Sequence, residues 1–240
     1  DVEIAFNQQF QNHLGIPGNE AIEIQTIAQT KAALQDVERT TDLTPALLYV
    51  FFVPSPSLET GKIGSNATQD ISLIQYADDE TRDRSQDTLE LVLVTGQGNP
   101  IRHHFWNVTR KDVEAMVGDL QSQVTRLHAG PRQYLPPAQA LYRQLISPLA
   151  SDLETLDINS LTFILDSGLR SIPMAALHDG DQFLVENYTI SIMPSFSLID
   201  TNRTTLHDMQ VLAMGASEFT AQRALPAVPQ ELSFIAHAAR

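Results

Sequence analysis

The stretch LTFILDSGLRSIPMAAL, residues 161–177, decides the fold of this chain. Its apolar run 161–165 is typical of a buried strand, and Asp166 and Gly168 end that run. Open α/β sheets place ligand-binding groups where strands emerge at their carboxyl ends. The stretch therefore predicts a core strand that leads straight into a functional turn.

The sequence before this stretch alternates helical and strand patterns. Thr26 with Gln29 and Thr109 with Asp112 are spaced as reciprocal helix caps, and Pro148 is placed to kink a helix. The predicted elements are a helix at 20–39, a buried strand at 46–53, a hairpin of strands 89–95 and 101–108, a helix at 109–127 and a helix at 136–156.

The sequence after residue 177 has the pattern of short strands and tight turns. Strands are predicted at 182–193 and 211–214, and a helix begins at Pro229. We predict an α/β protein with an N-terminal α/β region at 1–157, which includes a polar excursion at 55–88, and a second domain that begins at 158. The helix that begins at Pro229 runs into Arg240, so we expect the second domain to be incomplete there.

Composition restricts the function classes. The chain has 15 Lys and Arg against 29 Asp and Glu, a formal net charge of −14, which disfavours nucleic acid as a partner. No apolar run approaches the length of a spanning helix, so we expect no membrane insertion and a soluble protein, with the cytoplasm favoured over secretion. The chain contains no cysteine, which excludes a thiol nucleophile within it.

The order of Asp166, Gly168, Leu169-Arg170, Pro173 and Ala176-Leu177 resembles the opening of the CHAT domain, a family of the caspase and separase clan. Residues 188–198, with Pro194-Ser195, are similar to the second strand of that family, and residues 211–217 to its third strand. The resemblance implies a bacterial protein with a caspase-like three-layer sandwich and a mostly parallel central sheet. It covers residues 158–240 and, more loosely, the helices before them.

The resemblance also implies a mechanism. In this clan a histidine that precedes a glycine promotes attack by a cysteine thiolate on a peptide carbonyl. Neither group is found here, since none of the seven histidines precedes a glycine, so we expect no catalytic residue, metal or cofactor in this chain. Both catalytic residues would come from a complementary downstream polypeptide that binds this chain.

Three residues are candidates for substrate binding. In relatives that cleave after arginine, an acid near Asp166 helps to bind the substrate guanidinium, and a carboxylate can accept two parallel N–H bonds from that group. The alternative is that Asp166 caps its own turn. Arg170 is a candidate for the same cleft or for an internal ion pair with Asp166 or Asp179, and Ser195 is the third candidate.

Two readings of the function stay open at this stage. The first is the large-subunit-like front part of a caspase-like cysteine endopeptidase that cleaves a peptide or protein substrate after arginine. Arg240 would then be a candidate for the arginine after which the protein is cleaved; the alternative is that the sequence is truncated there at an arbitrary point. The second is a CHAT-fold scaffold or protein-interaction module without activity.

Overall fold

The structure is a computed structural model that describes residues 2–14, 24–55, 83–126, 132–198 and 212–238. The chain divides into two compact units, Asp1–Ile199 and Asp200–Arg240. Most of the predicted polar excursion at 55–88 lies outside the described residues, as does Arg240. No described helix combines the length and the apolar character that crossing a membrane requires.

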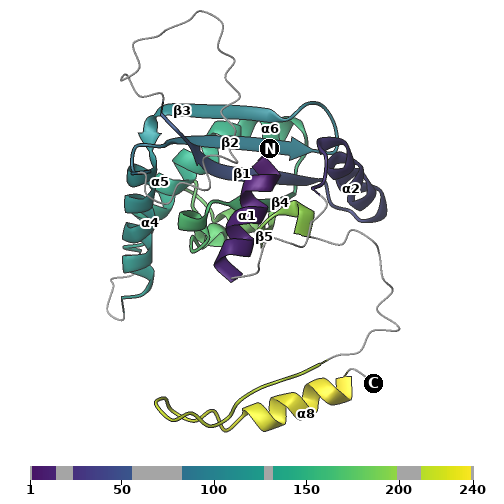
Figure 1. The fold of residues 1–240 in the computed structure, drawn as a ribbon, viewed down its shortest axis with the longest axis vertical. Helices are drawn as coiled ribbons and strands as arrows, with labels where there is room; N and C mark the ends of the chain where they lie inside the picture. Colours follow the sequence, from purple (N-terminus) through teal and green to yellow (C-terminus); the bar gives the residue numbers. More distant parts are fainter. Residues whose placement is uncertain (1, 15–23, 56–82, 127–131, 199–211, 239–240) are drawn as a thin grey trace, which may run out of the picture. The chain divides into compact units, whose positions relative to one another are not determined.

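The first unit is built on one mixed sheet of five strands (Figure 1). The strands are β1 (Pro45–Val53), β2 (Thr88–Thr95), β3 (Ile101–Thr109), β4 (Ser160–Leu165) and β5 (Thr189–Met193). Their order is β3-β2-β1-β4-β5, so the central strand β1 joins the hairpin to the strands that follow it.

The pairing of β1 differs on its two sides. It is antiparallel to β2, with Leu48 opposite Leu93, and parallel to β4, with Leu48 opposite Phe163. β2 and β3 are antiparallel, and β4 and β5 are parallel. Two of the four pairings are therefore parallel, and both involve β4, the strand on which the fold prediction rested.

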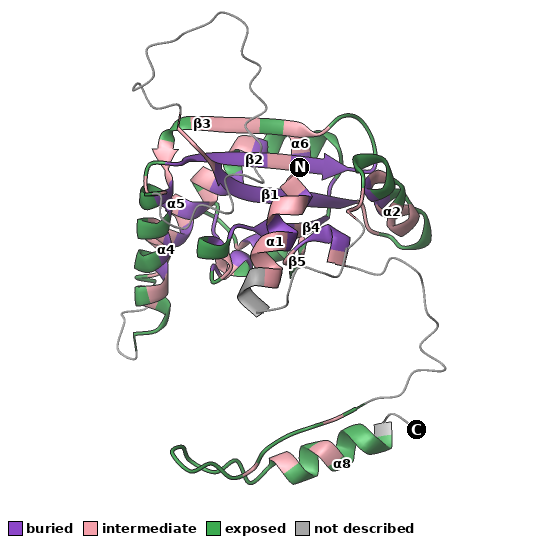
Figure 2. Ribbon diagram, viewed as in Figure 1, coloured by how far each residue is buried: buried purple, intermediate pink, exposed green. Residues whose placement is uncertain are grey.

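Helices cover both faces of this sheet, which makes three layers. On one face, α4 (Arg110–Val124), α5 (Leu135–Leu145) and α6 (Ala150–Thr155) pack on even-numbered side chains of β1 such as Leu48. On the other face, α1 (Val2–Leu14) and α2 (Ile27–Thr40) contribute Phe6 and Leu34 against odd-numbered side chains. Figure 2 shows the result, with β1 and β2 almost entirely buried between the layers.

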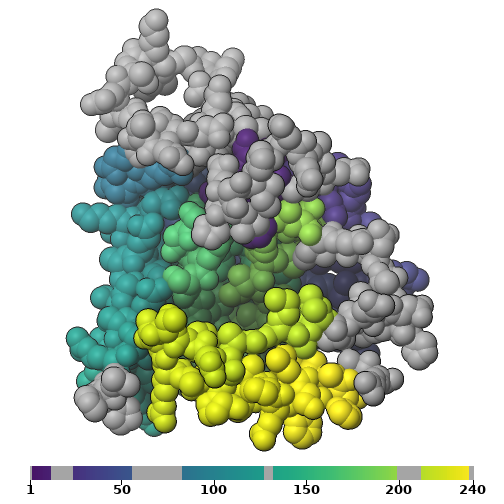
Figure 3. Space-filling view, turned by 60° about the horizontal axis from the view of Figure 1, so that its bottom comes forward, coloured from purple at the N-terminus to yellow at the C-terminus, as the bar shows by residue number. Residues whose placement is uncertain are grey.

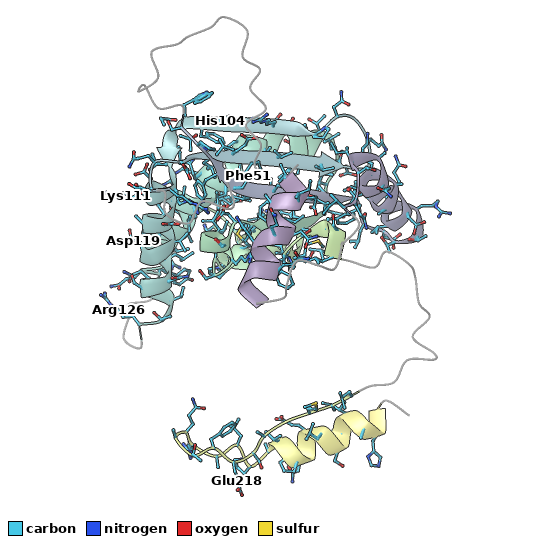
Figure 4. The ribbon with its side chains drawn as sticks, viewed as in Figure 1. Phe51, His104, Lys111, Asp119, Arg126 and Glu218 are labelled. Atoms are coloured by element: carbon cyan, nitrogen blue, oxygen red, sulfur yellow. The ribbon has the colours of Figure 1, made fainter. Side chains whose placement is uncertain are left out.

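The sequence of α4 explains its orientation. Val113, Val117 and Leu120 are buried against the sheet. Lys111 and Asp119 are exposed on the side of the helix that faces solvent, as Figure 4 shows. The spacing of three or four residues between the buried positions is that of one helical face.

Most predicted elements of this unit are confirmed. Both capping boxes form, Thr26 with Gln29 and Thr109 with Asp112, but the helix predicted at 20–39 is α2 and begins at Ile27. The predicted helix 136–156 is interrupted at Pro148 by a short 3-10 turn, η1 (Ser147–Leu149). The α/β class is confirmed, and the layered sheet is compatible with a caspase-like sandwich.

Two strand predictions were wrong. In the segment 182–193, residues Leu184–Asn187 form the short helix α7, so β5 is confined to Thr189–Met193. Residues 212–214 form no strand, because no neighbouring strand is hydrogen-bonded to them among the described residues.

The second unit, drawn in yellow in Figure 3, contains the helix α8 (Val228–Ala238) and an extended segment before it. The backbone of Gly215 lies close to this helix, since a Cβ at that position would be 2.6 Å from Cγ1 of Val228. Several large apolar side chains of this unit are exposed, among them Leu212, Met214 and Phe234. A helix predicted from Pro229 is thus confirmed.

The predicted domain boundary between residues 157 and 158 falls inside the first unit. Strand β1, before this boundary, and strand β4, after it, are direct neighbours in the sheet. Residues on the two sides of the boundary therefore share one hydrophobic core. The division into domains at 1–157 and 158–240 stays a prediction, and the two parts do not have separate hydrophobic cores in the described residues.

Two paired positions of β4 and β5 differ in burial and should therefore differ in their contribution to stability. Replacement of the buried Phe163 by Ala is expected to lower the free energy of unfolding by about 3–5 kcal/mol, because it leaves a cavity in the centre of the sheet. The control is Ile192→Ala, at the position paired with Phe163 but about half exposed (48%), with an expected loss below ~1.5 kcal/mol. Urea unfolding measures both; equal losses would contradict the described burial.

Candidate functional site

The candidate site lies at the sheet edge where the parallel strands β4 and β5 end. Asp166 directly follows β4, and Pro194-Ser195 directly follows β5. Because the two strands are parallel, these two turns leave the sheet at the same edge. The carboxyl edge of parallel strands is where open α/β sheets bind their ligands.

Asp166 is buried and holds an internal arginine. Its two carboxylate oxygens accept hydrogen bonds from Nη1 and Nη2 of Arg110, at 2.9 and 3.1 Å. Arg110 is the first residue of α4, and both partners are more than nine-tenths buried. The pair is a bidentate, charge-assisted interaction of the kind that fixes geometry as well as charge.

Further groups complete the surroundings of the Arg110 guanidinium. Its Cζ lies 4.4 Å from the centroid of the Phe52 ring, a cation–π contact, and its Nη1 lies 3.6 Å from Oε1 of Glu114. Gly168 is tightly placed beside them, since a Cβ there would be 2.7 Å from Oε1 of Glu114. A side chain at this position would therefore have to displace the Glu114 carboxylate.

The electrostatics of this cluster depend on a second buried acid, Asp87. Burial raises the pKa of Asp87 to about 6, the positive charge of Arg110 opposes this rise, and the negative charge of Asp166 adds to it. Burial alone would lower the pKa of Arg110, but its hydrogen bonds to Asp166 and the charges of Asp166, Glu114 and Asp87 raise it. One guanidinium therefore serves several carboxylates.

This geometry constrains the predicted role of Asp166. A substrate arginine that bound its carboxylate would compete with Arg110, which already donates hydrogen bonds to both oxygens. The predicted bidentate interaction between the Asp166 carboxylate and a guanidinium is present, but the guanidinium is that of Arg110 in the same chain. Binding of a substrate arginine by Asp166 stays a prediction.

Arg170 lies beside the same turn without an ion pair to a described residue. Its Nε donates a hydrogen bond to the carbonyl oxygen of Leu165 at 3.2 Å, and burial lowers its pKa, an effect that the charge of Asp166 partly offsets. The expected internal pair with Asp166 or Asp179 is therefore not formed. Its Nη2 is buried without a hydrogen-bond partner among the described residues.

Ser195 is fully buried and donates a hydrogen bond to Glu3 Oε2 at 2.6 Å. Glu3, in the first turn of α1, also accepts hydrogen bonds from the backbone N–H groups of Phe196 (3.2 Å) and Ser197 (3.0 Å) and from the Ser197 hydroxyl (3.0 Å). The Tyr49 hydroxyl is a fifth donor to the same carboxylate. A substrate does not reach Ser195 in this arrangement; its predicted substrate role stays untested.

Glu3 and Arg110 were missed by sequence reasoning. Glu3 lies 192 residues before Ser195, and Arg110 lies 56 residues before Asp166, so no local pattern joins them. The one available signal was the apolar, helix-compatible segment around Phe6. Burial, together with the negative charge and hydrogen bond of Glu3, raises the pKa of Tyr49, which keeps this hydroxyl a donor.

The site holds two turns in place but supplies no thiol nucleophile, since the chain has no cysteine. The described residues include no group of three or more His, Cys, Asp or Glu side chains that could hold a metal ion. What the arrangement can do is hold two backbone turns rigidly at the carboxyl edge of the sheet.

The fold and this edge define an α/β protein compatible with the caspase-like class. A comparison with protein families identifies the segment: the model of the CHAT domain matches residues 135–240, which confirms the family that the motif around Asp166 indicated. Searches of the curated proteins and of the solved structures gave no match. Arg110 and Glu3 both lie outside the matched residues.

The Arg110–Asp166 pair gives a direct stability prediction. Asp166→Asn is expected to lower the free energy of unfolding by about 3 kcal/mol or more, because it removes the charge that compensates a buried guanidinium. The control is Asp36→Asn, which breaks the exposed pair with Arg39 and should cost below ~0.5 kcal/mol. Urea unfolding at pH 7 compares them. Similar losses for both would show that Asp166 is not buried with Arg110.

The raised pKa of Asp87 gives a prediction about pH. A folded pKa of about 6, above the ordinary 3.8, means that ionised Asp87 destabilises the folded state. This penalty is absent below pH 4, grows between pH 4 and 6 and is complete above pH 6, at about 3 kcal/mol or less. Asp87→Asn should therefore gain stability relative to the parent as pH rises through this window.

The control for this experiment is Asp179, whose pKa is lowered, chiefly by the hydrogen bond from the backbone N–H of Gln182. Its ionised form stabilises the folded state, and this contribution is complete above the ordinary pKa of 3.8, so Asp179→Asn should be less stable than the parent by a nearly constant amount from pH 4 to 8. Unfolding at a series of pH values from 4 to 8 measures both variants. Equal slopes for the two would contradict the burial of Asp87.

Proposed function

We propose that this chain is the front part of a caspase-like cysteine endopeptidase of the CHAT family, completed by a downstream segment that carries the catalytic histidine and cysteine. The observation that carries the proposal is the CHAT match at 135–240 on a sheet whose parallel strands end in two rigid turns. The match supports a caspase-like family member, and the peptidase activity is what we propose beyond it.

Exposed apolar groups support the need for a complementary polypeptide. Within the first unit Ile192 of the edge strand β5 is about half exposed, and within the second unit, taken by itself, Leu212, Met214 and Phe234 are mostly exposed. A unit this small rarely folds on its own apolar core. A further segment of the same protein that covers such groups would complete the domain and bring the catalytic residues with it.

We further propose that the substrate is a peptide or protein cleaved after arginine. For this specificity a carboxylate must face the bound side chain, because a guanidinium requires a bidentate acceptor. Because Asp166 already accepts hydrogen bonds from Arg110, another carboxylate of the completed enzyme is favoured as the group that binds the substrate arginine. The same hydrogen bonds also favour, as a second candidate function, a scaffold that has kept the fold without the activity.

The test uses the complete protein and a pair of peptide reporters that differ only in arginine or citrulline before the scissile bond. Citrulline has the shape of arginine without its charge. We expect cleavage of the arginine peptide at least about tenfold faster, and loss of all cleavage when the downstream cysteine is replaced by serine. Cleavage of neither peptide would refute the peptidase proposal and leave the scaffold.

The same reporters examine Asp166. If Arg110 keeps its carboxylate, Asp166→Asn should slow cleavage of both peptides alike and leave the ratio of arginine to citrulline unchanged. If the substrate arginine binds Asp166, the ratio itself should fall towards one.

A further inference from the structure

The two turns at the carboxyl edge of the sheet share one property. Each belongs to the segment that matches the CHAT family, and each is held by a buried charged side chain from outside that segment. Arg110, at the start of α4, holds the turn after β4, and Glu3, in α1, holds the turn after β5. The two anchors come from helices on opposite faces of the sheet.

The anchor at β4 leaves the turn little freedom. The bidentate pair fixes Asp166 in both distance and direction, and the Asp166 carbonyl accepts the N–H of Leu169 at 2.8 Å, which closes the turn η2 (Ser167–Leu169). The Glu114 side chain of α4 also lies close to Gly168 of this turn. A shift of α4 would therefore move the turn with it.

The anchor at β5 acts on the backbone directly. Four of the five hydrogen bonds to Glu3 come from three consecutive residues, Ser195 to Ser197, and two of the four donors are backbone N–H groups. Such bonds to a carboxylate are stronger than neutral ones. The path of residues 195–197 therefore depends on a side chain almost two hundred positions earlier in the chain.

We propose that Arg110 and Glu3 are positioning residues for the peptidase reaction: they hold the two turns of the sheet edge at which the downstream catalytic residues must act. The N-terminal region then sets the activity of the CHAT segment through these two contacts. This inference rests on the proposed function. A displacement of about 1 Å at a reacting centre can cost about a hundredfold in rate.

The experiment compares Arg110→Lys and Glu3→Gln with Arg102→Gln in the complete protein, with the arginine reporter peptide. Lysine keeps the charge at 110 but not the paired N–H bonds, and glutamine at 3 turns one acceptor atom into a donor facing other donors. Arg102 also pairs with a buried acid, Glu90, but touches neither turn. It therefore controls for lost stability.

We expect kcat to fall about tenfold or more in both test variants, with KM changed less than about threefold, whereas Arg102→Gln keeps the kcat of the parent per folded molecule. Equal kcat values for the three variants would overturn the proposal. So would a rise in KM alone, because that would indicate lost substrate binding and not lost positioning.

Hydrogen exchange supplies a readout that does not need activity. In Glu3→Gln the amides of Phe196 and Ser197 should exchange at least tenfold faster, while those of strand β4 stay as in the parent. Faster exchange throughout the sheet would show a merely structural role and overturn the proposal. If the parent protein cleaves no peptide, the peptidase proposal fails, and this exchange pattern still decides whether Glu3 positions the turn.

Discussion

The parallel pairing of β1 with β4 is the constraint on which the rest of the structure depends. β1 lies between β2 and β4 and is buried on both faces, so its even-numbered and odd-numbered side chains enter two different cores. A shift of its register by one residue would exchange the two sets. Because β4 carries the opening motif of the CHAT segment, that segment obtains its central sheet neighbour from residues outside the family match.

The buried charges extend this dependence from the sheet to its edge. A buried ion pair adds little net stability compared with an apolar pair of the same size, but removing one partner is costly, so such pairs specify geometry. Two such contacts fix the point at which a strand ends and its turn begins: Arg110 with Asp166 after β4, and Glu3 with residues 195–197 after β5. The two contacts make the N-terminal region a part of the candidate site, although it supplies no reacting group.

Sequence reasoning found what local patterns encode. The apolar runs of β1 and β4, both capping boxes and the break at Pro148 follow from neighbours within a few residues. It could not find what depends on contacts far apart in the chain: the partner of Asp166, the role of Glu3 and the shared sheet. The errors have the same cause, since residues 184–187 and 212–214 are short segments with apolar residues, and only tertiary pairing decides whether such a segment forms a strand.

The central claim is that the CHAT segment cannot build its sheet without the residues before it. Hydrogen exchange of the β4 amides, residues 161–165, in the isolated segment 135–240 tests this most directly, with the whole chain as reference. In the whole chain β4 is hydrogen-bonded to β1, so the account predicts that its amides are strongly protected from exchange. In the isolated segment, which lacks β1, it predicts almost no protection. Equal protection in the two would contradict it.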